Sequence, residues 1–205
     1  MLLTSKPKNP ETIERIFGAA EALFLERNYA DVTVAQIAAE AELTKGAVYH
    51  YFPSKEKLYL GMLYSDFEKK SNLYRQAAIE FEGSCADRLR HLIRAFLALP
   101  ERKRKLIGLV RRDIDIFPPK ARTELIVAYQ QALPDLVEEI LRDGVRNGEI
   151  IPCDPRLLAW QFVAQVEVVL TPYADQVFSC DDDRLNFVMA LFMDGCSHAR
   201  TGGKK

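Results

Sequence analysis

The segment 33–58, TVAQIAAEAELTKGAVYHYFPSKEKL, constrains the fold of this 205-residue chain more than any other. Thr33 can cap a helix that starts at the next residue, because its hydroxyl can accept a hydrogen bond from a backbone N–H left free at the helix start. Apolar residues then recur at helical spacing, and Thr44 can cap a second helix over 45–51. Pro53 cannot continue that second helix. The segment therefore predicts two short helices joined by a tight turn.

This layout is that of a helix-turn-helix, whose second helix enters the major groove of DNA. Four consecutive aromatic or imidazole side chains end the second helix: Tyr49, His50, Tyr51 and Phe52. A short helix cannot bury all four, and a phenol hydroxyl that projects outward can donate to a phosphate oxygen. Lys55 follows at the start of the next helix, and helix N-termini attract phosphate. These residues favour a DNA-binding pair over two helices that merely pack together.

The start of the second helix also suits contact with bases. Lys45 can reach a guanine edge, and Gly46, which lacks a side chain, lets the backbone approach the bases. The stretches ALFLERNYADVTVAQIAAEA and TKGAVYHYFPSKEKL resemble the TetR family of one-component bacterial transcriptional regulators. The matching residues are Phe24, Gly46, Tyr49, Phe52, Lys55 and Leu58. The resemblance covers residues 10–60 well, and beyond them it is supported by length and helical pattern alone.

The resemblance implies a homodimer that binds a palindromic operator in double-stranded DNA and releases it when a small-molecule effector binds the C-terminal domain. Because the family usually represses, a repressor is expected. By position, the resemblance implies phosphate contacts for Thr33, Tyr49, Tyr51 and Lys55, and base contacts for Ala35, Thr44, Lys45 and Gly46, with His50 in the same motif.

One position departs from the family pattern. Glu42 stands where the turn usually has glycine. A non-glycine residue with positive φ costs about 1–2 kcal/mol, so the turn is expected to be slightly strained or differently shaped. The second helix also offers few base-reading side chains besides Thr44 and Lys45, so DNA shape is expected to contribute to specificity.

Composition argues against membrane, secreted and metal-binding proteins. The chain is 48% hydrophobic, enough for a substantial core, yet no apolar run is long enough to span a bilayer. The start, MLLTSKPKNPE, lacks the apolar core of a secretory signal. The four cysteines form no CxxC pair, which argues against a metal site and favours reduced thiols in a cytoplasmic protein. We expect no cofactor and no membrane partner.

The charge does not by itself indicate a nucleic-acid partner, because the net charge is −1. Positive charge must then be placed locally, as at Lys45, Lys55 and Lys57. Lys6 and Lys8 can reach the DNA backbone, although a solvated tail is the expectation for them. With three histidines and no catalytic signature, an enzyme is not expected. An adaptor that uses the aromatic patch to bind a protein is the remaining alternative.

Periodicity predicts an all-α chain of two domains. A flexible tail, 1–9, precedes a three-helix helix-turn-helix domain over 10–60. A helical ligand-binding and dimerisation domain is expected over 61–200. Pro134 should kink or break the predicted helix 120–147.

A pocket for a small, largely apolar effector is expected between the helices of residues 85–178, because bundles place such sites between facing helices. Its candidate walls, for each of which ordinary core is the favoured interpretation, are Phe96, Leu109, Ile116, Tyr129, Leu133, Trp160, Phe162 and Tyr173. Gln161, Gln165 and Glu167 interrupt an apolar helix, where an unpaired polar group is costly. They can orient a ligand, bond across a dimer or face a wet gap.

Two C-terminal segments, LLAWQFVAQVEVVL and LNFVMALFM, are too apolar for helices with one wet face. Either they are buried in their own domain, or they pair with the same helices of a second chain. The dimer is favoured, because a palindromic site requires a twofold protein. The expected interface residues are Phe162, Val166, Val169, Phe187 and Leu191.

The segment 101–112 is rich in basic residues, namely Arg102, Lys103, Arg104, Lys105, Arg111 and Arg112. A solvated basic face is the expected interpretation. The alternative is a site for an anionic ligand head, such as a coenzyme A phosphate beside an apolar acyl pocket.

Overall fold

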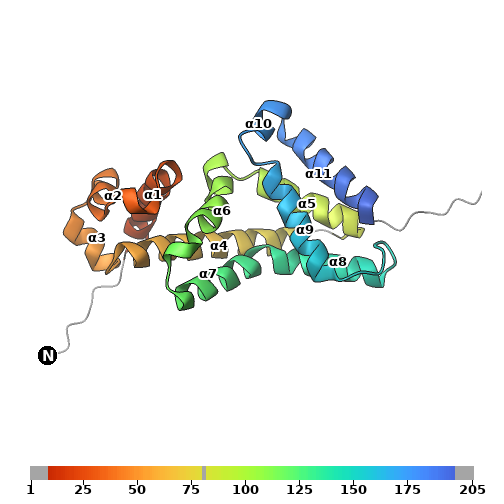
Figure 1. Ribbon diagram of the computed structural model, residues 1–205, viewed down its shortest axis with the longest axis horizontal. Helices are drawn as coiled ribbons and strands as arrows, with labels where there is room; N and C mark the ends of the chain where they lie inside the picture. Colours follow the sequence, from red (N-terminus) through yellow and green to blue (C-terminus); the bar gives the residue numbers. More distant parts are fainter. Residues whose placement is uncertain (1–8, 80–81, 197–205) are drawn as a thin grey trace, which may run out of the picture. The chain divides into compact units, whose positions relative to one another are not determined.

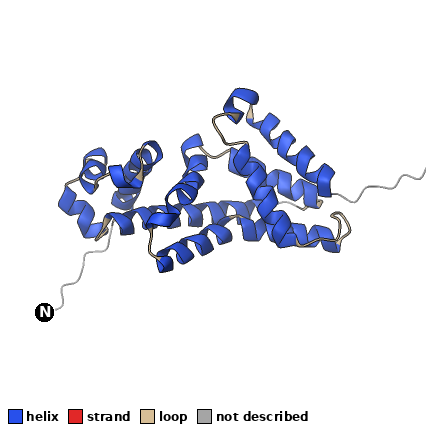
Figure 2. Ribbon diagram, in the orientation of Figure 1, coloured by secondary structure: helices blue, strands red, loops and turns tan. Residues whose placement is uncertain are grey.

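The computed structural model describes residues 9–79 and 82–196, and every regular element in these residues is a helix (Figure 1, Figure 2). The elements are α1 (Pro10–Glu26), η1 (Tyr29–Asp31), α2 (Val34–Glu40), α3 (Lys45–Tyr51), α4 (Lys55–Ile79), α5 (Cys85–Leu97), α6 (Glu101–Asp113), η2 (Ile114–Ile116), α7 (Pro119–Ala132), α8 (Pro134–Arg146), α9 (Pro155–Val168), α10 (Ala174–Val177) and α11 (Asp181–Cys196), where η denotes a short 3-10 helix. The all-α class predicted from the sequence is confirmed. The tail lysines Lys6 and Lys8 lie outside the described residues.

The chain divides into two compact units. Unit 1 combines Met1–Asp66 with Lys105–Leu125, and unit 2 combines Phe67–Arg104 with Ile126–Lys205. Unit 1 is therefore larger than the predicted domain 10–60. It gains most of α6 and the start of α7, which come from a distant part of the sequence.

Local sequence explains the first three helices. Asn9 Oδ1 accepts a hydrogen bond from the backbone N–H of Glu11 at 3.0 Å, and Pro10 occupies the first helical position of α1, where its missing N–H costs nothing. The buried face of α1 includes Ile16 and Phe24. α1 contacts α2, which contacts α3. This arrangement leaves α1 as the support of the α2–α3 pair.

A buried polar network fastens the end of α6 within unit 1. The Tyr59 hydroxyl on α4 donates to Asp113 Oδ2 at 2.6 Å. Arg112 Nη2 donates to the same carboxylate oxygen at 2.7 Å and to the carbonyl oxygen of Phe24 at the end of α1 at 2.9 Å. Asp113 and Tyr59 are both buried, and this burial, together with the Asp113 carboxylate, raises the pKa of the Tyr59 hydroxyl. One carboxylate thus joins α4 and α6 and, through Arg112, reaches α1.

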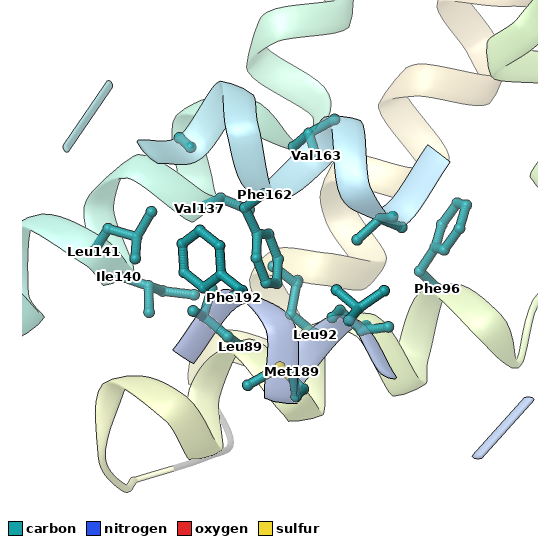
Figure 3. Packing of buried hydrophobic residues seen from close by; sticks show 14 of the residues in the cluster. Leu89, Leu92, Phe96, Val137, Ile140, Leu141, Phe162, Val163, Met189 and Phe192 are labelled. Carbon is teal, nitrogen blue, oxygen red and sulfur yellow. The ribbon is translucent and has the colours of Figure 1, made fainter. Parts of the chain in front are cut away.

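The core of unit 2 is formed by α5, α8, α9 and α11 (Figure 3). Phe162 of α9 lies edge-on against Phe192 of α11, with ring centroids 4.8 Å apart. Pro134 starts α8 after a break at Leu133, so the predicted interruption is confirmed as a break. α8 and α9 pack closely on each other. Unit 2 is consequently a bundle with its own hydrophobic core.

Within the described residues, none of the helices combines the length and apolar character that a membrane span requires.

Candidate nucleic-acid interface

The two threonine caps predicted from the sequence are present. Thr33 Oγ1 accepts from Gln36 N at 3.2 Å, while Gln36 Oε1 accepts from Thr33 N at 2.8 Å, a reciprocal capping box at the start of α2. Thr44 Oγ1 accepts from Ala47 N at 3.1 Å at the start of α3. The starts of the two helices, at Val34 and Lys45, follow from these caps.

α3 presents one face to solvent: among its seven residues Val48 is buried, Ala47 and Tyr51 are half-buried, and the other four are exposed. The exposed members of the predicted site are Thr33, Ala35, Thr44, Lys45, Gly46, Tyr49 and His50. Tyr51 is half-buried, and its ring lies edge-on to that of His50 at 5.5 Å. Lys45 Nζ lies 5.9 Å from the centre of the Tyr49 ring. The predicted residues therefore lie on and around one exposed helix of unit 1.

Lys55 has a role that sequence reasoning missed. Its ammonium donates to the carbonyl oxygens of Tyr29 at 2.7 Å and Val32 at 2.8 Å, and it lies 4.2 Å from the centre of the Tyr29 ring. Desolvation by burial lowers the pKa of this lysine, against an opposing effect of Asp31. Lys55 thus fixes the segment that leads into the Thr33 cap. Two of the three N–H donors of the ammonium are used in these bonds, so the predicted phosphate contact can involve only the third.

The predicted effector residues are divided between the two units. Leu109 and Ile116 belong to unit 1, where Leu109 is buried and Ile116 is exposed, whereas the other candidates belong to unit 2. In unit 2, Phe96 is part of the core and Tyr173 is 74% exposed. Neither unit by itself therefore contains all of the residues that are predicted to line the pocket.

Tyr129 of α7 brings part of the predicted set together. Its hydroxyl donates to Glu167 Oε1 at 3.0 Å, and its ring lies 6.4 Å from Trp160 and 6.1 Å from Phe67. Gln161 is exposed, while the buried Oε1 atom of Gln165 has no hydrogen-bond partner in the described part of the chain. The two glutamines thus differ in environment although they are four residues apart.

The basic segment is only partly a solvated face. Arg104 is largely buried, and its Nη1 atom pairs with Asp181 Oδ1 at 2.9 Å within unit 2. Arg112 is held by Asp113 and by the Phe24 carbonyl within unit 1. Arg102, Lys105 and Arg111 are exposed. The prediction of a solvated face is therefore wrong for Arg104, and Arg112 serves an internal network.

The predicted dimer interface also needs correction. Phe162, Val166 and Val169 are between 1% and 4% exposed, so they belong to the protomer's own core and are not available to a second chain. α9 is apolar on both sides. Phe162 and Val166 lie on its inward side, and Val169 is the buried residue at its C-cap. The outward side of α9 carries Leu157 and Val168. The predicted interface residues on α11, Phe187 and Leu191, are 48% and 56% exposed.

Comparison with known proteins identifies the family. The model described as "Bacterial regulatory proteins, tetR family" matches residues 16–62, and the model described as "Tetracyclin repressor-like, C-terminal domain" matches residues 82–175. Among curated relatives, the nucleoid occlusion factor SlmA of Aliivibrio fischeri is 29% identical over 164 residues, which cover 78% of this chain and 83% of that protein.

Solved structures share the fold over most of the chain. FadR from Bacillus subtilis, solved in complex with stearoyl-CoA, is 19% identical with a TM-score of 0.76, over 89% of this chain and 98% of that chain. A tetR-family regulatory protein from Rhodococcus RHA1 is 18% identical with a TM-score of 0.79, over 93% and 100% of the two chains. With its capped α2–α3 pair and its helical unit 2, the chain belongs to the TetR family of ligand-responsive, DNA-binding transcriptional regulators.

Proposed function

We propose that this regulator binds an inverted-repeat operator as a homodimer, with one α3 in the major groove at each half-site. The observation that carries the proposal is α3 itself, a well-capped helix that buries Val48, half-buries Ala47 and Tyr51, and exposes Lys45, Gly46, Tyr49 and His50. Such a helix can enter the major groove with its exposed face while its buried face keeps its contacts with the rest of unit 1. A regulator of this kind acts in the cytoplasm, where the chromosome lies, and it needs no catalytic site.

Base contact by Lys45 can be separated from phosphate contact by a second lysine. Lys45→Ala is expected to lower affinity for the operator about 10-fold or more while changing affinity for a scrambled duplex much less, since a specific base contact contributes about 1–3 kcal/mol. Lys57, exposed in the first turn of α4, is the matched control. Lys57→Ala should weaken both duplexes about equally. Fluorescence anisotropy at fixed salt measures both, and the reverse pattern would contradict the two roles.

The exposed apolar side chains of α9 and α11 support dimerisation through unit 2. Leu157, Val168, Phe187 and Leu191 are each at least 48% exposed, an unusual concentration for the surface of a monomer. A four-helix interface made by two copies of α9 and α11 would cover such side chains.

Leu191→Glu is expected to weaken the dimer at least about 30-fold, because charge at an apolar interface costs about 2 kcal/mol or more. Ile151→Glu is the matched control, since Ile151, like Leu191, is an exposed branched aliphatic residue of unit 2 but lies outside both helices. Sedimentation equilibrium reports the dissociation constant of each variant. A Leu191→Glu protein as dimeric as the wild type would place the interface elsewhere.

The effector class that we would test first is an acyl-coenzyme A. The support is a shared fold with FadR of Bacillus subtilis, whose structure contains stearoyl-CoA. Stearoyl-CoA titrated against the protein–operator complex should then release the DNA, because an effector can shift the equilibrium only if it prefers the DNA-free state. Unchanged operator affinity at saturating stearoyl-CoA would remove this class and leave the DNA-binding proposal intact.

A second candidate function follows from the similarity to nucleoid occlusion factors at 29% identity. DNA binding by α3 would serve both functions. The positions of the binding sites separate them: sites beside a few promoters favour gene regulation, whereas many sites spread along the chromosome favour a role in nucleoid occlusion.

A further inference from the structure

The turn between α2 and α3 contains the single non-glycine residue with positive φ among the described residues. Glu42 has a φ of 53°. Its N–H donates to the carbonyl oxygen of Ala39 at 3.0 Å, and the N–H of Leu43 donates to that of Ala38 at 2.8 Å. This pair of bonds is a Schellman closure of α2, in which the residue at the position of Glu42 is usually glycine. The expected strain is therefore present, at the residue that sets the course of the chain into α3.

Arg15, which lies 27 residues earlier on α1, braces this turn. Its Nη2 atom donates to the carbonyl oxygen of Ala41 at 2.6 Å and lies 3.4 Å from both the carbonyl oxygen and the Oε2 atom of Glu42. A guanidinium here also complements the negative end of the α2 dipole. The Glu42 side chain is 89% exposed, so its ion pair with Arg15 contributes little. The bond to the Ala41 carbonyl is the firm contact.

We propose that Arg15 is a positioning residue for the DNA-binding helix. It holds the left-handed turn at Glu42 so that α3 keeps a fixed orientation on α1 and α2. Thr44 and Lys45 follow the turn directly, so a change in the backbone at Glu42 rotates both of them. The hydrogen bonds that distinguish bases tolerate such rotation poorly, whereas contacts with phosphates are less directional. The inference rests on the proposed binding of DNA by α3.

The test uses the full chain and three variants. Arg15→Met removes the guanidinium but retains an apolar stem, Glu42→Gly removes the strain, and the third variant combines them. Arg27→Met is the matched control, because it removes an exposed arginine from the C-terminal end of the same helix. Affinities are measured for a selected operator and for a scrambled duplex, and hydrogen exchange is measured at the Leu43 amide.

Arg15→Met is expected to lower the ratio of operator to scrambled affinity about 5–10-fold and to speed exchange at Leu43. The double variant should recover most of the affinity ratio and most of the protection of the Leu43 amide, because glycine adopts positive φ without strain. Arg27→Met should leave the ratio unchanged. An Arg15→Met protein with wild-type ratio and exchange would overturn the inference, as would an equal loss for both duplexes. If the wild type selects no operator, the proposed function fails, while the exchange data still decide whether Arg15 braces the turn.

Discussion

Asp113→Ala is expected to lower the free energy of unfolding of unit 1 by about 2–4 kcal/mol and to weaken operator binding with it. The substitution removes the close acceptor of the buried Tyr59 hydroxyl, which keeps the longer bond to the Leu109 carbonyl oxygen at 3.5 Å, and it leaves the Arg112 guanidinium without its carboxylate. It also loosens the link from α6 to the Phe24 carbonyl at the end of α1. Urea titration followed by far-UV circular dichroism measures the loss. Fluorescence of Trp160, the one tryptophan of the chain, reports unit 2 separately.

Asp115→Ala is the control for this prediction. Asp115 is also an aspartate of unit 1, two residues away, but its side chain is 85% exposed and pairs with Arg122 at 3.1 Å. An exposed pair of this kind contributes about 0–1 kcal/mol. If Asp113→Ala were as mild as Asp115→Ala, the buried network would not hold the end of α6.

Phe162→Ala should destabilise unit 2 by about 3–5 kcal/mol, the usual cost of removing a buried phenylalanine side chain. The ring fills the centre of the core beside Phe192 (Figure 3). Phe187→Ala is the matched control, since Phe187 is a half-exposed phenylalanine of the same unit. It should change the unfolding of the protomer little and weaken the dimer instead. Thermal unfolding and sedimentation equilibrium of both variants measure the two effects.

This pair of variants tests the corrected assignment of α9. A Phe162→Ala protein that keeps its stability but dissociates into monomers would restore Phe162 to the interface and contradict the packing described above.

Local chemistry made the N-terminal helices predictable. A threonine cap accepts a hydrogen bond from a backbone N–H only three residues later, so Thr33 and Thr44 indicate the starts of α2 and α3 from the sequence alone. Pro134 likewise predicts a break, because proline has no backbone N–H to donate the hydrogen bond that a continuous helix requires.

Distant contacts were not predictable in the same way. The carbonyl partners of Lys55 lie 23 and 26 residues earlier, and those of Arg112 include one 88 residues away. No spacing rule connects such positions. On α9, apolar residues occupy both sides of the helix, so periodicity could not show which side faces the core. Phe162, Val166 and Val169 were for that reason assigned to the wrong surface.

The central claim is that α3 binds specific DNA as part of a dimer, and selection of genomic fragments by the purified, effector-free protein at physiological salt tests it most directly. The account predicts enrichment of a short inverted repeat by the wild type and loss of that enrichment with Lys45→Ala. Absence of any enriched sequence from protein shown to be folded and dimeric would contradict the account and favour an adaptor that uses the aromatic residues of α3 to bind a protein partner.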